Sequence, residues 1–193
     1  MRKVRLEDIA GPARYAEMRD EFRRRIIELK RNRRIPLGDR VTLVFENFDT
    51  VLFQTQEMLH VERITDLDRV REEIDVYNQL LPNENELSAT MLIEITDKER
   101  IATELNKLIG IDEHVFMRVG DETFRATFEP GRSTEEKLSA VQYVRFPLSP
   151  SAARTFGEPG TEVEIRVEHP QYRASTILTP EQRASLARDL CPE

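Results

Sequence analysis

The chain has 193 residues, of which 39% are hydrophobic and 34% are charged, and its net charge is −7. Charges of both signs are interspersed with apolar residues, which argues against disorder and predicts a globular protein with a compact core. Its one cysteine, Cys191, excludes an internal disulfide and a cysteine-based metal cluster. No apolar run approaches the roughly 18 residues of a membrane span, so we expect a cytoplasmic protein that does not bind a membrane.

The charge is divided unevenly along the chain. Residues 1–40 hold 13 Lys and Arg against 7 Asp and Glu, a net charge of +6, so the other residues carry −13. This polarity can steer a charged partner or let protomers of a homo-oligomer meet head to body. A solvated amphipathic helix gives the same count without any partner.

The first predicted element is an amphipathic helix over residues 13–34. Its apolar side chains recur at steps of three and four residues: Tyr15, Met18, Phe22, Ile26 and Leu29. Pro36 and Gly38 are expected to end this helix. Cations occupy its last turns, as the negative end of the helix dipole favours: Lys30, Arg31, Arg33 and Arg34. Together with Arg23, Arg24 and Arg25 they can grip phosphate, so nucleic-acid binding is one alternative function.

A β-branched strand over residues 40–45 and two more helices follow. Asn47 is the expected N-cap of the first helix, whose apolar residues are expected to face the core: Val51, Leu52, Met58, Leu59 and Val61. The second helix covers residues 66–80 and ends before Pro82, with a periodic set of Leu67, Val70, Ile74, Tyr77 and Leu81. The first 80 residues are therefore expected to be largely helical.

Strands dominate from residue 86 onward. Alternating patterns and turn residues predict strands over 87–95, 114–120, 123–130, 140–148, 161–170 and 172–178. Helices are expected over 97–110, briefly after 149, and from Pro180 to the end. Strands and helices do not alternate as βαβ units, so the fold class is α+β: a helical N-terminal part packed on a mainly antiparallel sheet with additional helices. A single domain over 1–193 is predicted, with a division into 1–82 and 83–193 as the alternative.

The stretch from Glu46 to Glu62 carries the candidate site, because amides, carboxylates and a histidine lie there among large apolar residues. Such polar groups are costly to bury unless they are paired. They form either a helix cap with an internal polar network or a surface for a ligand or partner. The candidate binding residues are Glu46, Asn47, Asp49, Gln54, Gln56 and Glu57, together with Arg31 and Arg34 at the end of the basic helix.

Glu57 and His60 have the E-x-x-H spacing that places a carboxylate and an imidazole on one face of a helix, as in di-iron bundles. A second E-x-x-H is missing, and His114 and His169 fall in a predicted strand and a turn. A redox enzyme that holds iron or another divalent metal, with Glu57 and His60 as ligands and Glu46 or Glu62 beside them, is therefore a second alternative. The main interpretation predicts no cofactor and no catalytic residue, and no phosphate-binding loop or nucleophile motif is found.

Several segments resemble a family of uncharacterised bacterial proteins, a domain of unknown function: RIIELKRNRRIPLG, FENFDTVLFQTQEML, IDVYNQLLP, LSATMLIEI, VRFPL and VEHPQYRA. The resemblance covers nearly the whole chain. Members are often encoded beside a rubrerythrin-like protein and an iron–sulfur protein similar to heterodisulfide reductase subunits, which implies a link to redox or peroxide-stress physiology. The family often has a basic residue at the position of His60, so only the candidate residues from Glu46 to Glu57 carry over.

The function predicted from the sequence is that of a non-catalytic accessory protein. It would contact an acidic partner, an iron–sulfur or rubrerythrin-like protein, through the polar residues 46–57 and the arginines at 30–34.

Overall fold

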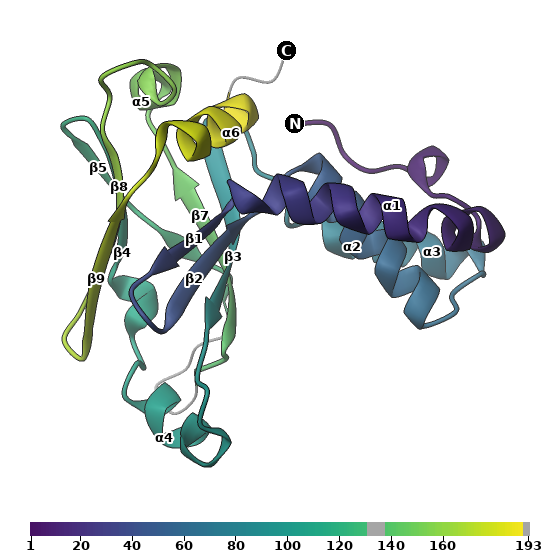
Figure 1. Ribbon diagram of the computed structural model, residues 1–193, viewed down its shortest axis with the longest axis horizontal. Helices are drawn as coiled ribbons and strands as arrows, with labels where there is room; N and C mark the ends of the chain where they lie inside the picture. The colour runs from purple at the N-terminus through teal and green to yellow at the C-terminus, as the bar shows by residue number, and fades with distance from the viewer. Residues whose placement is uncertain (131–137, 191–193) are drawn as a thin grey trace.

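The computed structural model describes residues 1–130 and 138–190, with the side chain of Lys98 left out, so that Cys191 lies outside the described residues. Two antiparallel sheets pack face to face, and a helical arm projects from one side of them (Figure 1). The predicted α+β fold class is confirmed. In the described part of the chain, none of the helices is both long enough and apolar enough to cross a membrane.

The arm consists of α1 (Pro12–Arg31), α2 (Phe48–Val61), α3 (Leu67–Asn78) and the short 3-10 helix η1 (Leu6–Asp8). The buried stripe of α1, formed by Tyr15, Phe22 and Ile26, packs against Leu52 and Phe53 of α2. The Asn47 cap expected for α2 is confirmed, and α3 has a cap of the same kind that was not predicted. Asn47 accepts a hydrogen bond from the Thr50 amide, and Asp66 accepts from two amides of the first turn of α3.

The five-stranded sheet has the order β1-β2-β3-β7-β6, and the four-stranded sheet has the order β5-β4-β8-β9. Their bounds are β1 Arg34–Leu37, β2 Val41–Phe45, β3 Glu86–Ile93, β4 Val115–Val119, β5 Glu122–Arg125, β6 Thr127–Phe128, β7 Val141–Pro147, β8 Val163–His169 and β9 Tyr172–Ile177. Alternate residues of β4, β7 and β8 are buried, and the two inner faces share one apolar core.

The end of the first helix differs from the expectation. Helix α1 ends at Arg31, and Pro36 lies in β1, an edge strand where a missing N–H is tolerated. Gly38 lies in the β1–β2 turn with φ +71°, and a Cβ there would come within 2.6 Å of the Tyr172 hydroxyl. That hydroxyl donates to the Leu37 carbonyl and accepts from the Arg40 amide at 3.1 Å. Tyr172 of β9 therefore joins the second sheet to this turn.

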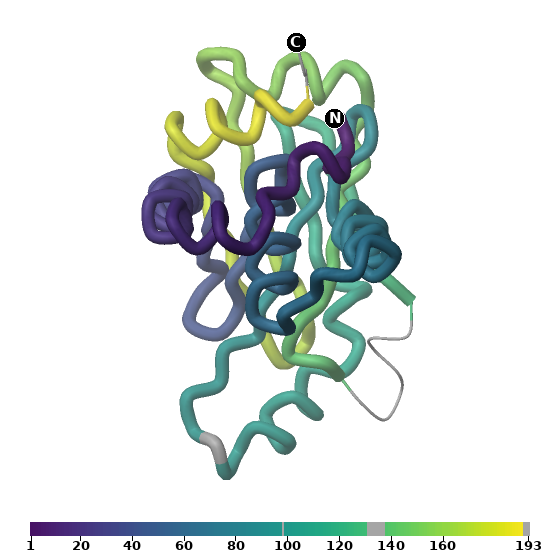
Figure 2. The backbone as a smooth tube through the Cα atoms, turned by 90° about the vertical axis from the view of Figure 1, so that its right-hand side faces the viewer, coloured from purple at the N-terminus to yellow at the C-terminus, as the bar shows by residue number. Residues whose placement is uncertain are grey.

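Three further helices and two 3-10 turns cover the ends of the sheets: α4 Ile101–Asn106, α5 Pro150–Thr155, α6 Pro180–Leu190, η2 Lys98–Arg100 and η3 Ile111–Glu113. Helix α6 lies where the arm meets the sheets (Figure 1). Strands β1 and β2 precede residue 82, yet β1 pairs with β2 and β2 pairs with β3. The chain therefore leaves the arm for the sheet after α1 and returns to the arm at α2, both before residue 82. Figure 2 shows the arm from its own side, with the sheets behind it.

A candidate binding pocket on the helical arm

Three of the candidate side chains are engaged at the base of the arm. Glu46 is 2% exposed, and its carboxylate accepts hydrogen bonds from the hydroxyls of Thr50 and Thr90 and from Gln54 Nε2, the last two at 2.8 Å. The Asn47 side chain caps α2. The structure therefore places Glu46, Asn47 and Gln54 in an internal network that joins the start of α2 to β3.

Gln56 binds the N-terminal segment. Its side-chain oxygen accepts from the Ala10 amide at 2.8 Å, and its Nε2 donates to the Ala10 carbonyl at 3.1 Å. Asn78 holds Val4 in the same way, with both bonds at 2.9 Å. The side-chain amides of Gln56 and Asn78 each bind both the N–H and the C=O of one backbone residue, as a neighbouring strand would. They hold residues 4–10 against α2 and α3.

Glu57 forms the charged centre of the arm. Its carboxylate accepts from Arg19 Nε at 2.7 Å and Nη2 at 2.8 Å, and from the Tyr15 hydroxyl at 2.7 Å. The bidentate Arg19 pair lowers the pKa of Glu57 from 4.5 to about 2, and the Tyr15 hydrogen bond adds to this effect. Burial raises the pKa of the Tyr15 hydroxyl, and the neighbouring Glu57 carboxylate raises it further.

Glu57 is expected to make the free energy of unfolding fall as the solution becomes acidic. Its folded pKa is depressed, so its contribution is complete above pH 4.5 and is lost as the pH falls towards 2. We expect Glu57→Gln to cost about 1 kcal/mol at pH 7, since water partly screens the pair. Urea unfolding of both proteins should show this difference shrinking between pH 4.5 and pH 2. Glu28→Gln, on an exposed carboxylate of α1, is the control; an equal pH dependence in both variants would contradict the assignment.

The other half of the E-x-x-H pair, His60, lies with its ring edge against Tyr15, at 5.6 Å between ring centres. Across residues 1–130 and 138–190, no group of three or more His, Cys, Asp or Glu side chains is placed to hold a metal ion. Both carboxylate oxygens of Glu57 already bind Arg19. The metal-binding alternative through Glu57 and His60 stays a prediction.

The cations near the end of α1 serve different parts of the molecule. Arg31 pairs with Glu28 one turn earlier at 3.1 Å, and Arg34 of β1 pairs with Glu94. Arg33 is buried and pairs with Asp189 of α6. Asp49, the remaining candidate, lies 3.7 Å from Arg25. Arg31 and Arg34 thus pair with acids outside residues 46–57. Nucleic-acid binding by this helix stays a prediction.

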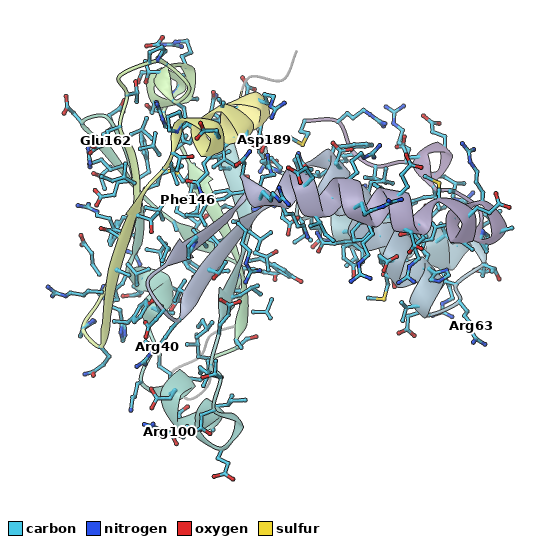
Figure 3. The ribbon with its side chains drawn as sticks, viewed as in Figure 1. Arg40, Arg63, Arg100, Phe146, Glu162 and Asp189 are labelled. Carbon is cyan, nitrogen blue, oxygen red and sulfur yellow. The ribbon has the colours of Figure 1, made fainter. Side chains whose placement is uncertain are left out.

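A pocket of about 790 Å³ opens at the free end of the arm. It lies between the N-terminal segment, α1, the end of α2 and the start of α3. Its walls are mostly apolar: Leu6, Ile9, Ala10, Tyr15, Leu59, Ile64 and Val70. Its polar lining includes Gln56, His60, Arg19 and Arg63, and Figure 3 shows Arg63 at this end of the arm, far from the sheets. An apolar concavity of this size with a few polar groups is the usual form of a binding site.

Large apolar side chains also form the rim of the pocket. Leu6 is 38% exposed, Val61 63% and Leu67 56%. The expectation that Val61 faces the core is therefore wrong, and Leu67 of the periodic set in the next helix is exposed as well. The apolar stripes of α2 and α3 each include a residue that the arm does not bury. These residues, Val61 and Leu67, lie at the pocket.

Comparisons with known proteins agree with this architecture without assigning a role to the pocket. Residues 3–190 match the model of a protein family of unknown function, DUF3501. The chain belongs to the DUF3501 family. It is similar to the crystal structure of a novel protein of unknown function from Burkholderia pseudomallei K96243, with 33% identity, a TM-score of 0.92, and coverage of 98% of this chain and 100% of that one. No curated protein matches the chain.

The predicted resemblance to an uncharacterised family is thus confirmed for this DUF3501 chain. Its pocket was not predicted from the sequence, because Leu6 lies outside every predicted element and the periodicity of Val61 and Leu67 reads as core. One signal was present: Arg63 stands between two apolar stripes, where a helix end usually has glycine. Arg63 marks the mouth of the pocket only when α2 and α3 are known to lie side by side.

Proposed function

We propose that this DUF3501 protein is a non-catalytic accessory protein that binds a partner protein in the pocket of its helical arm. The observation that carries this proposal is an apolar pocket of about 790 Å³ whose rim exposes Leu6, Val61 and Leu67. Contiguous exposed apolar surface next to a pocket is typical of protein interfaces, in which a few buried anchors supply most of the affinity. A helix with spaced apolar anchors is the form of partner that fits between two helices.

The nature of the partner follows from the resemblance described above. An iron–sulfur protein or a rubrerythrin-like protein is the first candidate, which would connect the family to redox or peroxide-stress physiology. The cations Arg31 and Arg34 stay predicted as a separate contact at the base of the arm.

Co-purification from native cells tests the proposal. The variant replaces two apolar side chains of the pocket rim by uncharged polar ones. We expect Val61→Asn with Leu67→Asn to reduce recovery of the candidate partner about ten-fold or more, because two exposed anchors are lost. Ile177→Asn is the matched control, since Ile177 is also 56% exposed but lies on β9 of the sheets. Equal loss in both variants, or no loss in either, would refute the role of the pocket. In the same experiment, Arg31→Glu with Arg34→Glu tests the basic contact.

A further inference from the structure

The charges around the pocket indicate what its occupant carries. We propose, building on the proposed function, that the pocket recognises a partner segment with an acidic side chain next to its apolar anchor, and that Arg63 binds this acidic group. The lining side chains include two guanidinium groups, Arg19 and Arg63, and among the described residues no Asp or Glu lines the pocket. Glu57 balances the charge of Arg19 through a bidentate ion pair. An anion that enters beside an apolar anchor therefore meets one cation, Arg63, that has no acidic partner in residues 1–130 and 138–190, which favours acidic partners over neutral ones.

Both guanidinium groups retain capacity for a further anion. Glu57 occupies Nε and Nη2 of Arg19, and no hydrogen bond to its Nη1 is found among the described residues. Arg63 is exposed and has no ion pair or side-chain hydrogen bond within the described part of the chain. Of the two, Arg63 is free to bind a carboxylate in a bidentate manner, whereas Arg19 can offer further hydrogen bonding from Nη1 but no unbalanced charge, because Glu57 balances its charge.

The backbone of Arg63 gives an independent reason to look at its side chain. Arg63 has φ +53°, the left-handed conformation that closes α2. The Ile64 amide bonds to the Leu59 carbonyl at 2.9 Å and the Arg63 amide to the His60 carbonyl at 3.3 Å, which is the helix-ending motif that favours glycine at this position. Local stability therefore does not explain an arginine here. A non-glycine residue in a disfavoured conformation, with a free charge at a pocket mouth, points to binding.

A pair of probes separates the anion from the apolar body. 1-Anilinonaphthalene-8-sulfonate carries an anionic group on an apolar body, and N-phenyl-1-naphthylamine has the same body without the charge. Titrated into the full chain, the sulfonate should bind more tightly. Arg63→Gln should weaken it about ten-fold and change the neutral probe less than two-fold, the size expected when one charge-assisted contact is lost. Arg31→Gln, on an exposed arginine outside the pocket, should change neither.

Arg63→Gly distinguishes recognition from a structural role. It should weaken the sulfonate as Arg63→Gln does, while its melting temperature stays the same or rises because glycine suits the backbone. Equal affinity for the two probes, equal weakening of both by Arg63→Gln, or no binding of either probe would overturn the proposal.

Photo-crosslinking identifies the source of the acidic group. With p-benzoylphenylalanine in place of Thr65, an exposed pocket residue that is not one of the anchors, the partner peptide crosslinked in native cells should carry Asp or Glu within one helical turn of an apolar residue. Arg63→Glu should abolish this crosslink. A crosslinked peptide without acidic residues, or crosslinks to lipid alone, would overturn the assignment. If partner binding depends on Val61 and Leu67 but not on Arg63, this inference fails while the proposed function stands; if it depends on neither, the proposed function fails.

Discussion

Replacing Asp189 by Ala is expected to lower the free energy of unfolding by about 3–5 kcal/mol, because the Arg33 guanidinium would stay buried without its counter-ion. Arg33 is 1% exposed and Asp189 5%. Burial raises the pKa of Asp189 and the adjacent Arg33 opposes that rise, so the charged form depends on this pair. Urea denaturation of the wild type and of Asp189→Ala measures the loss, which is a large part of the stability of a typical domain.

The matched control replaces both partners by apolar residues. Arg33→Met with Asp189→Leu should be less destabilising than the sum of the two single changes, since neither charge is then left alone. A cost below about 1 kcal/mol for Asp189→Ala would mean that water reaches Arg33, and would contradict the role assigned to the pair.

The pair matters because of its place in the fold. Arg33 Nε donates to the Phe45 carbonyl at 2.9 Å, Nη2 to the Glu46 carbonyl at 3.0 Å and Nη1 to the Ser185 carbonyl at 3.2 Å. One side chain thus holds the exit from α1, the entry to α2 and helix α6 together. Figure 3 shows Asp189 where the arm meets the sheets. The position of the arm relative to the sheets is therefore expected to depend on this pair.

Local patterns predicted most elements of this fold. Asn47, Asp66 and Pro180 mark helix starts because capping and the fixed φ of proline act within one turn. The alternation in 163–169 predicts β8 because side chains alternate between the faces of a strand. Strand β1 was not predicted, because it has four residues and contains Pro36. The 127–128 segment joins the other sheet as β6, a non-local pairing that no local pattern encodes.

The site was less predictable for the same physical reason. Four cations at 30–34 look alike in the sequence, yet Arg33 is the buried one among them. The local sequence does not reveal this, because its partner Asp189 lies 156 residues away. The amide of Gln56 looks like a surface group, and the backbone that it pairs with is that of Ala10. Glu46 and Gln56, candidates for a binding surface, are buried and hydrogen-bonded inside the molecule, while Val61, predicted as core, lies at the pocket. Amphipathic periodicity identifies an apolar face but does not tell whether the same chain covers it.

The pocket wall itself yields the other large effect, at Tyr15. Tyr15 is completely buried, with its ring edge-on to Phe22 and to His60 at 6.4 and 5.6 Å. Tyr15→Ala should cost about 3–5 kcal/mol, because it removes an aromatic side chain from the contact between α1 and α2 and leaves a cavity. Tyr15→Phe removes the hydroxyl that binds Glu57 and should cost only about 1 kcal/mol.

Thermal unfolding of the two variants gives these costs, and titration with N-phenyl-1-naphthylamine reports the pocket. Tyr15→Phe should bind this neutral probe like the wild type, because the ring that forms the wall is kept. Tyr15→Ala, studied well below its melting temperature, should bind it several-fold more weakly, because the wall between α1 and α2 is lost. If Tyr15→Phe were as damaging as Tyr15→Ala, the hydrogen bond to Glu57 rather than the ring would hold the arm together. In that case the Glu57→Gln variant should show a comparable loss of stability at neutral pH.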